Sequence, residues 1–155
     1  MEEMTPARFE DGRPMFLAGV RRRHPFDETG EGLAAQWREL LAAEALPGRV
    51  GSSMYGVMCG ADASGFEYLC GVEVESFAGL PPDAGKVRVP PQRYAVFAPE
   101  GPLRATWMRI LDWLATGPYD SAHLPDFELY GPGADPLAES GPVEIWVGVV
   151  PRASS

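Results

Sequence analysis

The sequence has few cysteines, no long apolar run and no recognisable leader. Its 155 residues include only Cys59 and Cys70, too few for a scaffold stabilised by disulfides. No apolar stretch approaches the roughly 20 residues that a transmembrane helix needs. The acidic N-terminus MEEMTPARFEDG lacks the apolar segment and cleavage site of a signal peptide. We therefore expect a cytoplasmic protein with reduced thiols and no membrane association.

Positive charge is also scarce. Lys and Arg total 13 against 22 Asp and Glu, which gives a net charge of −9. A surface of this sign repels nucleic-acid phosphates, and the one basic cluster, RRRH at residues 21–24, is predicted to be a solvated strand end. Only about 13 residues precede the first predicted strand, so we expect no helix-turn-helix unit. Direct nucleic-acid binding is not expected.

Several catalytic signatures are missing as well. The string nearest to a GxSxG nucleophile elbow, Gly51 to Tyr55, lacks the closing glycine. There is no Walker loop and no cluster with metal-ligand spacing, while His24 and His123 lie far apart in the chain. We expect no metal and no cofactor. A reaction that needs only a carboxylate and a positioned water stays open.

The chain does contain two runs of elements in the order strand, helix, strand, strand. The first run is predicted at residues 14–20, 31–46, 54–60 and 67–77. The second is predicted at residues 87–97, 101–116, 126–130 and 142–150. Length and composition fit one α+β domain over residues 1–155. Its first half would span about residues 14–77 and its second about 86–150.

Strand alternation predicts which side chains face the helices. A turn near Ser64 and Gly65 would make Cys59 and Cys70 cross-strand neighbours. That register turns an apolar set toward the helix: Tyr55, Val57, Cys59, Cys70, Val72 and Val74. The same division of the second hairpin turns another such set toward the helix: Phe127, Leu129, Ile145, Val147 and Val149.

The opposite face of both hairpins is then expected to combine acids, aromatic rings and glycines. Its members are Gly56, Met58, Gly71, Glu73, Glu128, Tyr130, Glu144, Trp146 and Gly148. This composition is typical of a cleft for a flat, apolar, cationic molecule. A solvated second face with glutamates for solubility explains it equally well, because antiparallel sheets commonly expose one face.

Six stretches between about residues 14 and 150 carry a family resemblance: MYGV, YLCGVEVESF, VPPQRYAVFAPEGPL, DWLATGPY, DFELY and VEIWVGVV. In order and spacing they resemble the GyrI-like small-molecule-binding domain, related to the effector-binding domains of bacterial AraC-type and MerR-type multidrug regulators. The resemblance implies a duplicated strand-helix-strand-strand (SHS2-like) fold. Its two halves would be related by a pseudo-twofold axis, with a ligand cleft between their sheets.

The resemblance also implies a site. Its FE-x-Y element makes Glu128 the central pocket glutamate, a counter-charge for a cationic ligand. The expected ligand-binding residues are Glu128, Tyr130, Trp146, Glu144, Tyr55, Met58, Glu73, Tyr94 and Trp107. Trp107 also lies on the apolar stripe of its helix, and that position favours core packing over a place in the aromatic wall.

Three functions fit these residues, and we rank them in this order. The first is a stand-alone protein that binds small hydrophobic, often cationic aromatic compounds without turnover. The second is a hydrolase of strained cyclopropane-bearing compounds, similar to some stand-alone members, in which Glu128 would orient or deprotonate water. The third is a protein inhibitor of DNA gyrase, as the family name suggests, acting through surface residues that no motif marks.

Overall fold

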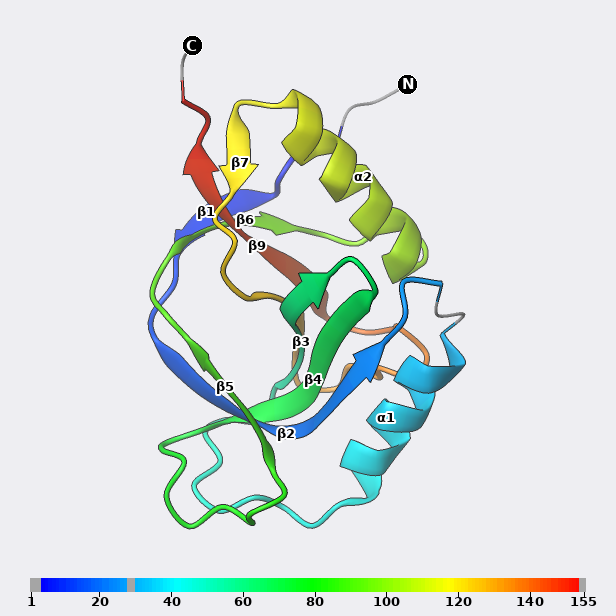
Figure 1. The fold of residues 1–155 in the computed structure, drawn as a ribbon, viewed down its shortest axis with the longest axis vertical. Helices are drawn as coiled ribbons and strands as arrows, with labels where there is room; N and C mark the ends of the chain where they lie inside the picture. The colour runs from blue at the N-terminus through cyan, green and yellow to red at the C-terminus, as the bar shows by residue number, and fades with distance from the viewer. Residues whose placement is uncertain (1–3, 28–29, 154–155) are drawn as a thin grey trace.

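The structure, a computed structural model, describes residues 4–27 and 30–153. They form a curled antiparallel sheet with two helices packed on it (Figure 1). The elements in chain order are β1 (Arg8–Asp11), β2 (Met15–His24), α1 (Glu31–Ala42), β3 (Met54–Asp62), β4 (Gly65–Val74), β5 (Gly85–Val89), β6 (Arg93–Phe97), α2 (Leu103–Thr116), β7 (Tyr119–Ser121), β8 (Asp126–Tyr130) and β9 (Val143–Pro151). Of the helices in the described residues, none is long and apolar enough to cross a membrane.

The strands follow the order β1-β6-β9-β8-β3-β4-β2-β5, and β7 pairs with β9 outside this row. All of these neighbours are antiparallel. At the centre β3 pairs with β8, which places Gly56 opposite Glu128. The α+β class predicted from the sequence is confirmed.

The observed elements differ from the predicted ones in a few places. Pro90 and Pro91 divide the predicted strand 87–97 into β5 and β6, because proline lacks the N–H that a strand interior requires. The sequence pattern predicts neither β1 nor β7, since strands of four and three residues are too short to show alternation.

The two faces of the sheet build separate cores. On the face covered by the helices, Trp37 of α1 and Ile110 of α2 join a buried cluster with Ile145 of β9. The other face lies inside the curl, where Val87 of β5 and Val96 of β6 belong to one cluster although their strands lie near opposite ends of the sheet. We call these sides the helix face and the inner face.

The register expected for the first hairpin is wrong. The turn comes one residue earlier than predicted, and a β-bulge at Cys59 interrupts the pairing of β3 with β4. An extra residue in one strand reverses the facing of every residue beyond it. Cys70 therefore lies opposite Gly56 instead of Cys59, and both cysteines are free thiols.

Both central strands consequently face the other way from the prediction. In β3, Met58 lies on the helix face and Tyr55 on the inner face. In β8, Glu128 and Tyr130 lie on the helix face, whereas Phe127 lies on the inner face. No tight turn connects β8 to β9, since residues 131–142 separate them, so no hairpin geometry sets their register in advance.

The flanking strands face as predicted. Cys70 of β4 and Ile145 of β9 pack on the helix face. Glu73 lies opposite Leu17, which is part of the inner-face core, and Trp146 packs against that same core. The prediction thus fails only at the two strands in the middle of the sheet.

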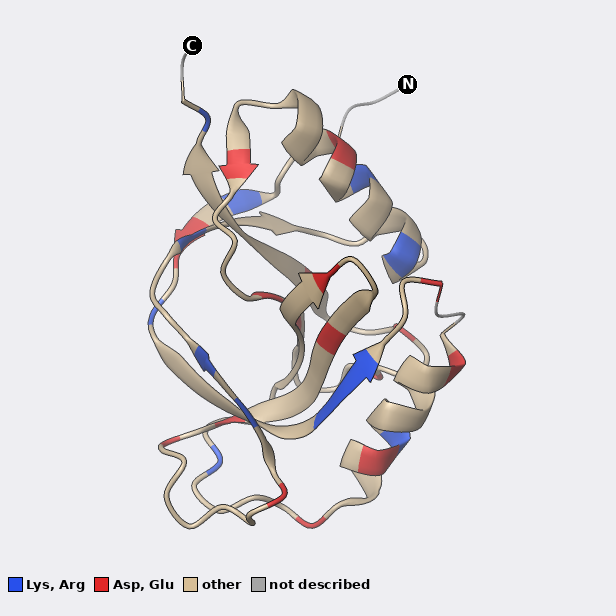
Figure 2. Ribbon diagram, in the orientation of Figure 1, with Lys and Arg blue, Asp and Glu red and all other residues tan. Residues whose placement is uncertain are grey.

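The basic cluster at residues 21–24 lies at the end of β2, where Figure 2 shows a blue band. Its arginines form ion pairs with carboxylates of neighbouring elements: Arg21 with Glu67, Arg22 with Glu39 and Arg23 with Asp62. Each guanidinium group of this cluster therefore has a carboxylate partner.

Candidate functional site

A pocket of about 410 Å³ opens on the helix face, beside α1, α2 and the central strands. Its lining is largely apolar and aromatic: Leu33 and Trp37 from α1, Leu103, Trp107 and Met108 from α2, Met58 from β3, Phe66 and Tyr68 from β4, and Tyr130 from β8. Glu128 lines the same space. We call it the helix-face pocket.

Glu128 is held by three hydrogen bonds. The hydroxyl groups of Tyr68 and Tyr130 donate to its Oε1 at 2.6 and 2.9 Å. The indole Nε1 of Trp107 donates to Oε2 at 2.8 Å. These donors belong to β4, β8 and α2, so separate elements converge on one carboxylate that is only 5% exposed.

The pKa of the Glu128 carboxyl group is raised above its usual value. Burial raises the pKa of Glu128, and its three hydrogen bonds lower the pKa in part. The donors are neutral, so they orient the carboxylate without cancelling its charge. Burial also raises the pKa of Tyr68 and of Tyr130, and the nearby Glu128 adds to both shifts. Both phenols therefore stay protonated and act as donors.

Gly56 makes room for this arrangement. A Cβ at this position would lie 1.9 Å from the Tyr68 hydroxyl and 2.7 Å from Oε1 of Glu128. Cβ atoms do not approach other atoms so closely. The hydrogen bond between Tyr68 and Glu128 therefore depends on a glycine across the central strand pair.

The sequence interpretation missed four aromatic residues of the pocket, Phe26, Trp37, Phe66 and Tyr68. Trp37 contacts Tyr130 edge-on at a centroid distance of 5.1 Å and Tyr68 at 6.4 Å. Tyr68 shares the face of Cys70, which was expected to point toward the helix, but the glutamate was expected on the other side. Once Glu128 is placed on the helix face, alternation alone selects Tyr68.

The expected site residues are divided between the two faces. Met58, Trp107, Glu128 and Tyr130 lie together in the helix-face pocket. The expectation that Glu128 shares a face with Glu73 and Glu144, away from the helices, is wrong, because the reversed central strands separate the acids. Trp107, for which the helix pattern favoured core packing, is half-buried and contacts Glu128 directly.

The remaining candidates lie on the inner face. Tyr55, Tyr94 and Trp146 line a second hollow there, of about 310 Å³. Glu73 and Glu144 are on the same face as these rings. The sheet therefore lies between these five residues and Glu128.

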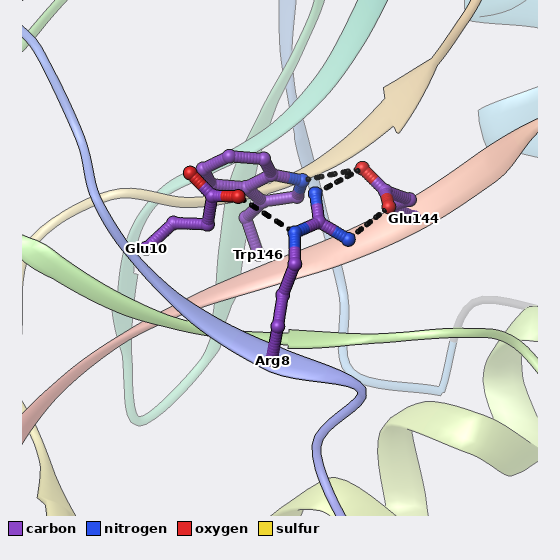
Figure 3. Close-up of polar contacts among 4 residues, drawn as sticks. All are labelled: Arg8, Glu10, Glu144 and Trp146. Carbon is purple, nitrogen blue, oxygen red and sulfur yellow. Dashed lines mark hydrogen bonds and ion pairs between the residues drawn. The ribbon is translucent and has the colours of Figure 1, made fainter.

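Both inner-face glutamates are paired with arginines. Arg8 donates to Glu144 from Nη1 at 2.6 Å and from Nη2 at 3.1 Å (Figure 3). Arg13 forms a two-point contact with Glu73. The hydrogen bond from Arg8 holds the pKa of Glu144 below its usual range.

The side chains of residues 4–27 and 30–153 form no cluster that could hold a metal ion. No three His, Cys, Asp or Glu side chains lie together there as metal ligands would. The polar groups that line the helix-face pocket are Glu128 with its three donors, and also Arg104 and Glu139.

A sequence model described as the GyrI-like small molecule binding domain matches residues 5–150. The chain belongs to this family. A comparison with curated protein sequences finds no match. The match covers nearly the whole described chain, including every strand and helix that lines the helix-face pocket.

Solved structures resemble this GyrI-like chain over almost its full length. An integron cassette protein from the mobile metagenome of Vibrio cholerae is 21% identical, with a TM-score of 0.68, covering 96% of this chain and 98% of that one. The protein SAV2435, solved with tetraphenylphosphonium bound, is 16% identical, with a TM-score of 0.69 and coverage of 92% and 93%. The C-terminal domain of EcmrR is 13% identical, with a TM-score of 0.64 and coverage of 94% and 97%. At these identities the likeness establishes the fold.

Proposed function

We propose that this protein binds hydrophobic, often cationic aromatic compounds in the helix-face pocket, with Glu128 as their counter-charge. The observation that carries this function is a carboxylate, 5% exposed, held by neutral donors inside an aromatic-lined pocket. Burying such a charge without a cation is costly. A lipophilic cation would neutralise it while contacting the rings of Trp37 and Trp107.

The structural neighbours support the same ligand class. SAV2435 shares the fold and was solved with tetraphenylphosphonium, a cation surrounded by phenyl groups. The ligand contacts we assign here are Glu128, Tyr130, Met58 and Trp107, together with Tyr68 and Trp37. Glu73, Glu144, Tyr55, Tyr94 and Trp146 are outside this assignment because they lie on the inner face.

We place the pocket between two halves that are related by duplication. The strand order supports this: β4 and β2 follow β3 on one side of the central pair, and β9 and β6 follow β8 on the other. Each set of three strands has its own helix after the outer strand in chain order. A pseudo-twofold axis would then pass between Gly56 and Glu128 and relate α1 to α2.

A matched pair of variants tests the counter-charge. Glu128→Gln should weaken tetraphenylphosphonium binding at least tenfold, which corresponds to about 1.4 kcal/mol. Glu144→Gln makes the same chemical change on the other face and should leave this affinity unchanged. Isothermal titration calorimetry measures both, and thermal unfolding of each variant checks that it is folded.

A neutral ligand separates charge from shape. Triphenylphosphine oxide has similar phenyl groups without a net charge, so Glu128→Gln should weaken its binding much less. Equal losses for the charged and neutral ligands would show that Glu128 only supports the fold. A loss of tetraphenylphosphonium binding in Glu144→Gln as large as in Glu128→Gln would also contradict the assignment.

Hydrolysis of strained cyclopropane-bearing compounds is the second candidate, and one observation favours it. Burial raises the pKa of Glu128, which makes its carboxylate a stronger base toward a water molecule beside a bound substrate. Mass spectrometry after incubation with such a compound distinguishes the two functions. An unchanged ligand supports binding alone, whereas addition of one water, lost in Glu128→Gln, supports hydrolysis.

A further inference from the structure

The hollow on the inner face has a preformed aromatic wall. Tyr55, Tyr94, Phe127 and Trp146 line its space of about 310 Å³. Neighbouring rings in this set lie at centroid distances between 5.3 and 5.5 Å. Because the rings support one another, a flat ligand would meet a surface that is already ordered. The sheet separates this surface from the helix-face pocket.

The rim of the hollow carries excess negative charge. Glu10 and Asp11 of β1 line it, and Asp11 forms an ion pair with Arg93 at 2.9 Å. Arg8 is shared between Glu10 and Glu144, and its guanidinium lies 5.6 Å from the Trp146 ring centroid (Figure 3). Two carboxylates therefore share one guanidinium beside the aromatic wall. This part of the rim attracts cations.

Arg13 connects the hollow to a buried acid. It lies in the short connection between β1 and β2 and lines the hollow. Its Nη2 donates to Oε1 of Glu73 at 2.7 Å, and its Nη1 donates to Oε2. The Glu73 side chain is 9% exposed, whereas the Arg13 side chain is 62% exposed. An exposed arginine thus neutralises a buried carboxylate beside an aromatic hollow.

We propose that this hollow is a second ligand site, for small planar aromatic cations of the amidinium or guanidinium type, and that Arg13 occupies its anionic position when no ligand is bound. The ligand cation would replace the Arg13 guanidinium on Glu73, while its ring would contact Tyr55 and the partly exposed Trp146. Glu73 stays paired throughout the exchange, so no buried charge is left alone.

The geometry also selects the kind of cation. Two parallel N–H donors match the two oxygens of Glu73, as Arg13 already shows. An amidinium or guanidinium group repeats this fork, and a compact ammonium group does not. The displaced Arg13 side chain moves into water at small cost because most of it is already exposed.

Benzamidine is the probe, since it joins a phenyl ring to a planar cation, and benzamide is its neutral counterpart. Calorimetry should show that Arg13→Ala binds benzamidine at least tenfold more tightly than the wild type, because the internal competitor is gone. This gain should disappear in Arg13→Ala/Glu73→Gln and persist in Arg13→Ala/Glu128→Gln. Benzamide should show no gain.

Three results would overturn the proposal: no gain in Arg13→Ala, a gain that persists without the Glu73 carboxylate, or a gain that depends on Glu128. Should Arg13→Ala fail to fold, Arg13→Gln keeps a hydrogen-bonding side chain at the same position and should show the same gain.

In the wild type, benzamidine should shift the Trp146 indole resonance in a proton–nitrogen correlation spectrum, with Trp146→Phe as the assignment control. A Trp146 resonance that stays unmoved up to the solubility limit of benzamidine would also overturn it.

Discussion

Glu128 is subject to opposing electrostatic effects. Burial disfavours its charged form, and hydrogen bonds from Tyr68, Trp107 and Tyr130 favour it. Burial is the larger effect, so the pKa is raised. A carboxyl group that has taken up a proton offers no counter-charge, so under the proposed function the protonation of Glu128 would control which ligands the helix-face pocket binds.

The affinity for a cation should consequently depend on pH. Below the raised pKa of Glu128 the neutral form predominates, so tetraphenylphosphonium should bind more weakly as the pH falls through that value. Calorimetric titrations over a pH series measure the effect. Glu128→Gln should bind weakly at every pH, and Glu144→Gln should keep the dependence of the wild type. A wild-type affinity that is constant across the series would contradict this role.

Among the elements, the central strand β3 decides where the site lies. Its bulge at Cys59 turns Met58 and Gly56 toward the helices. Gly56 then faces the space that the Tyr68 hydroxyl and the Glu128 carboxylate occupy. A strand without the bulge would present Tyr55 to the helices instead, and the pocket would lose the gap that admits the Tyr68 hydroxyl.

Two glycine substitutions in β3 test this packing. Gly56→Ala should destabilise the fold by about 1–3 kcal/mol through overpacking and should weaken tetraphenylphosphonium binding, because the new methyl group displaces the Tyr68 hydroxyl. Gly60→Ala is the control: its Cβ would meet nothing nearer than a Glu67 oxygen at 3.9 Å. Urea denaturation and calorimetry measure the two effects. Equal behaviour of both variants would show that the space beside Gly56 is unimportant.

In the molecule as a whole, the curled sheet buries acids as well as apolar side chains. Asp126 is half-buried and accepts a hydrogen bond from the Gly148 backbone N–H at 2.8 Å. Burial raises its pKa from 3.8 to about 7. The folded protein therefore binds more protons than the unfolded chain between these pH values. Its stability should fall as the pH rises through this interval and then level off.

Asp126→Asn isolates this contribution. Between about pH 4 and pH 7 the wild type should lose up to about 4 kcal/mol of unfolding free energy that the variant retains. The asparagine Oδ1 can still accept the Gly148 hydrogen bond, so the fold should persist. Urea denaturation over this pH range measures the difference, with Asp112→Asn on the exposed side of α2 as the control. A pH dependence that is the same in wild type and Asp126→Asn would contradict the prediction.

Local pattern is enough to predict much of this protein. Apolar periodicity predicts α1 and α2, and alternation predicts the facing of β4 and β9, because these features depend on neighbouring residues in the chain. The stretches DFELY and VEIWVGVV contribute to the family resemblance, and the family match confirms it. They also single out Glu128 and Tyr130, which the structure brings together in the helix-face pocket.

Only the tertiary structure decides on which side of the sheet these residues lie. The facing of β3 depends on one extra residue at Cys59, and that of β8 depends on pairing across the connection 131–142. The arginines that neutralise Glu73 and Glu144 come from 60 and 136 positions away in the chain. One inserted residue reverses the period-two alternation of a strand, so the facing of β3 and β8 could not be predicted from the sequence. Contacts between distant segments leave no local pattern, so the arginine–glutamate pairs could not be predicted either.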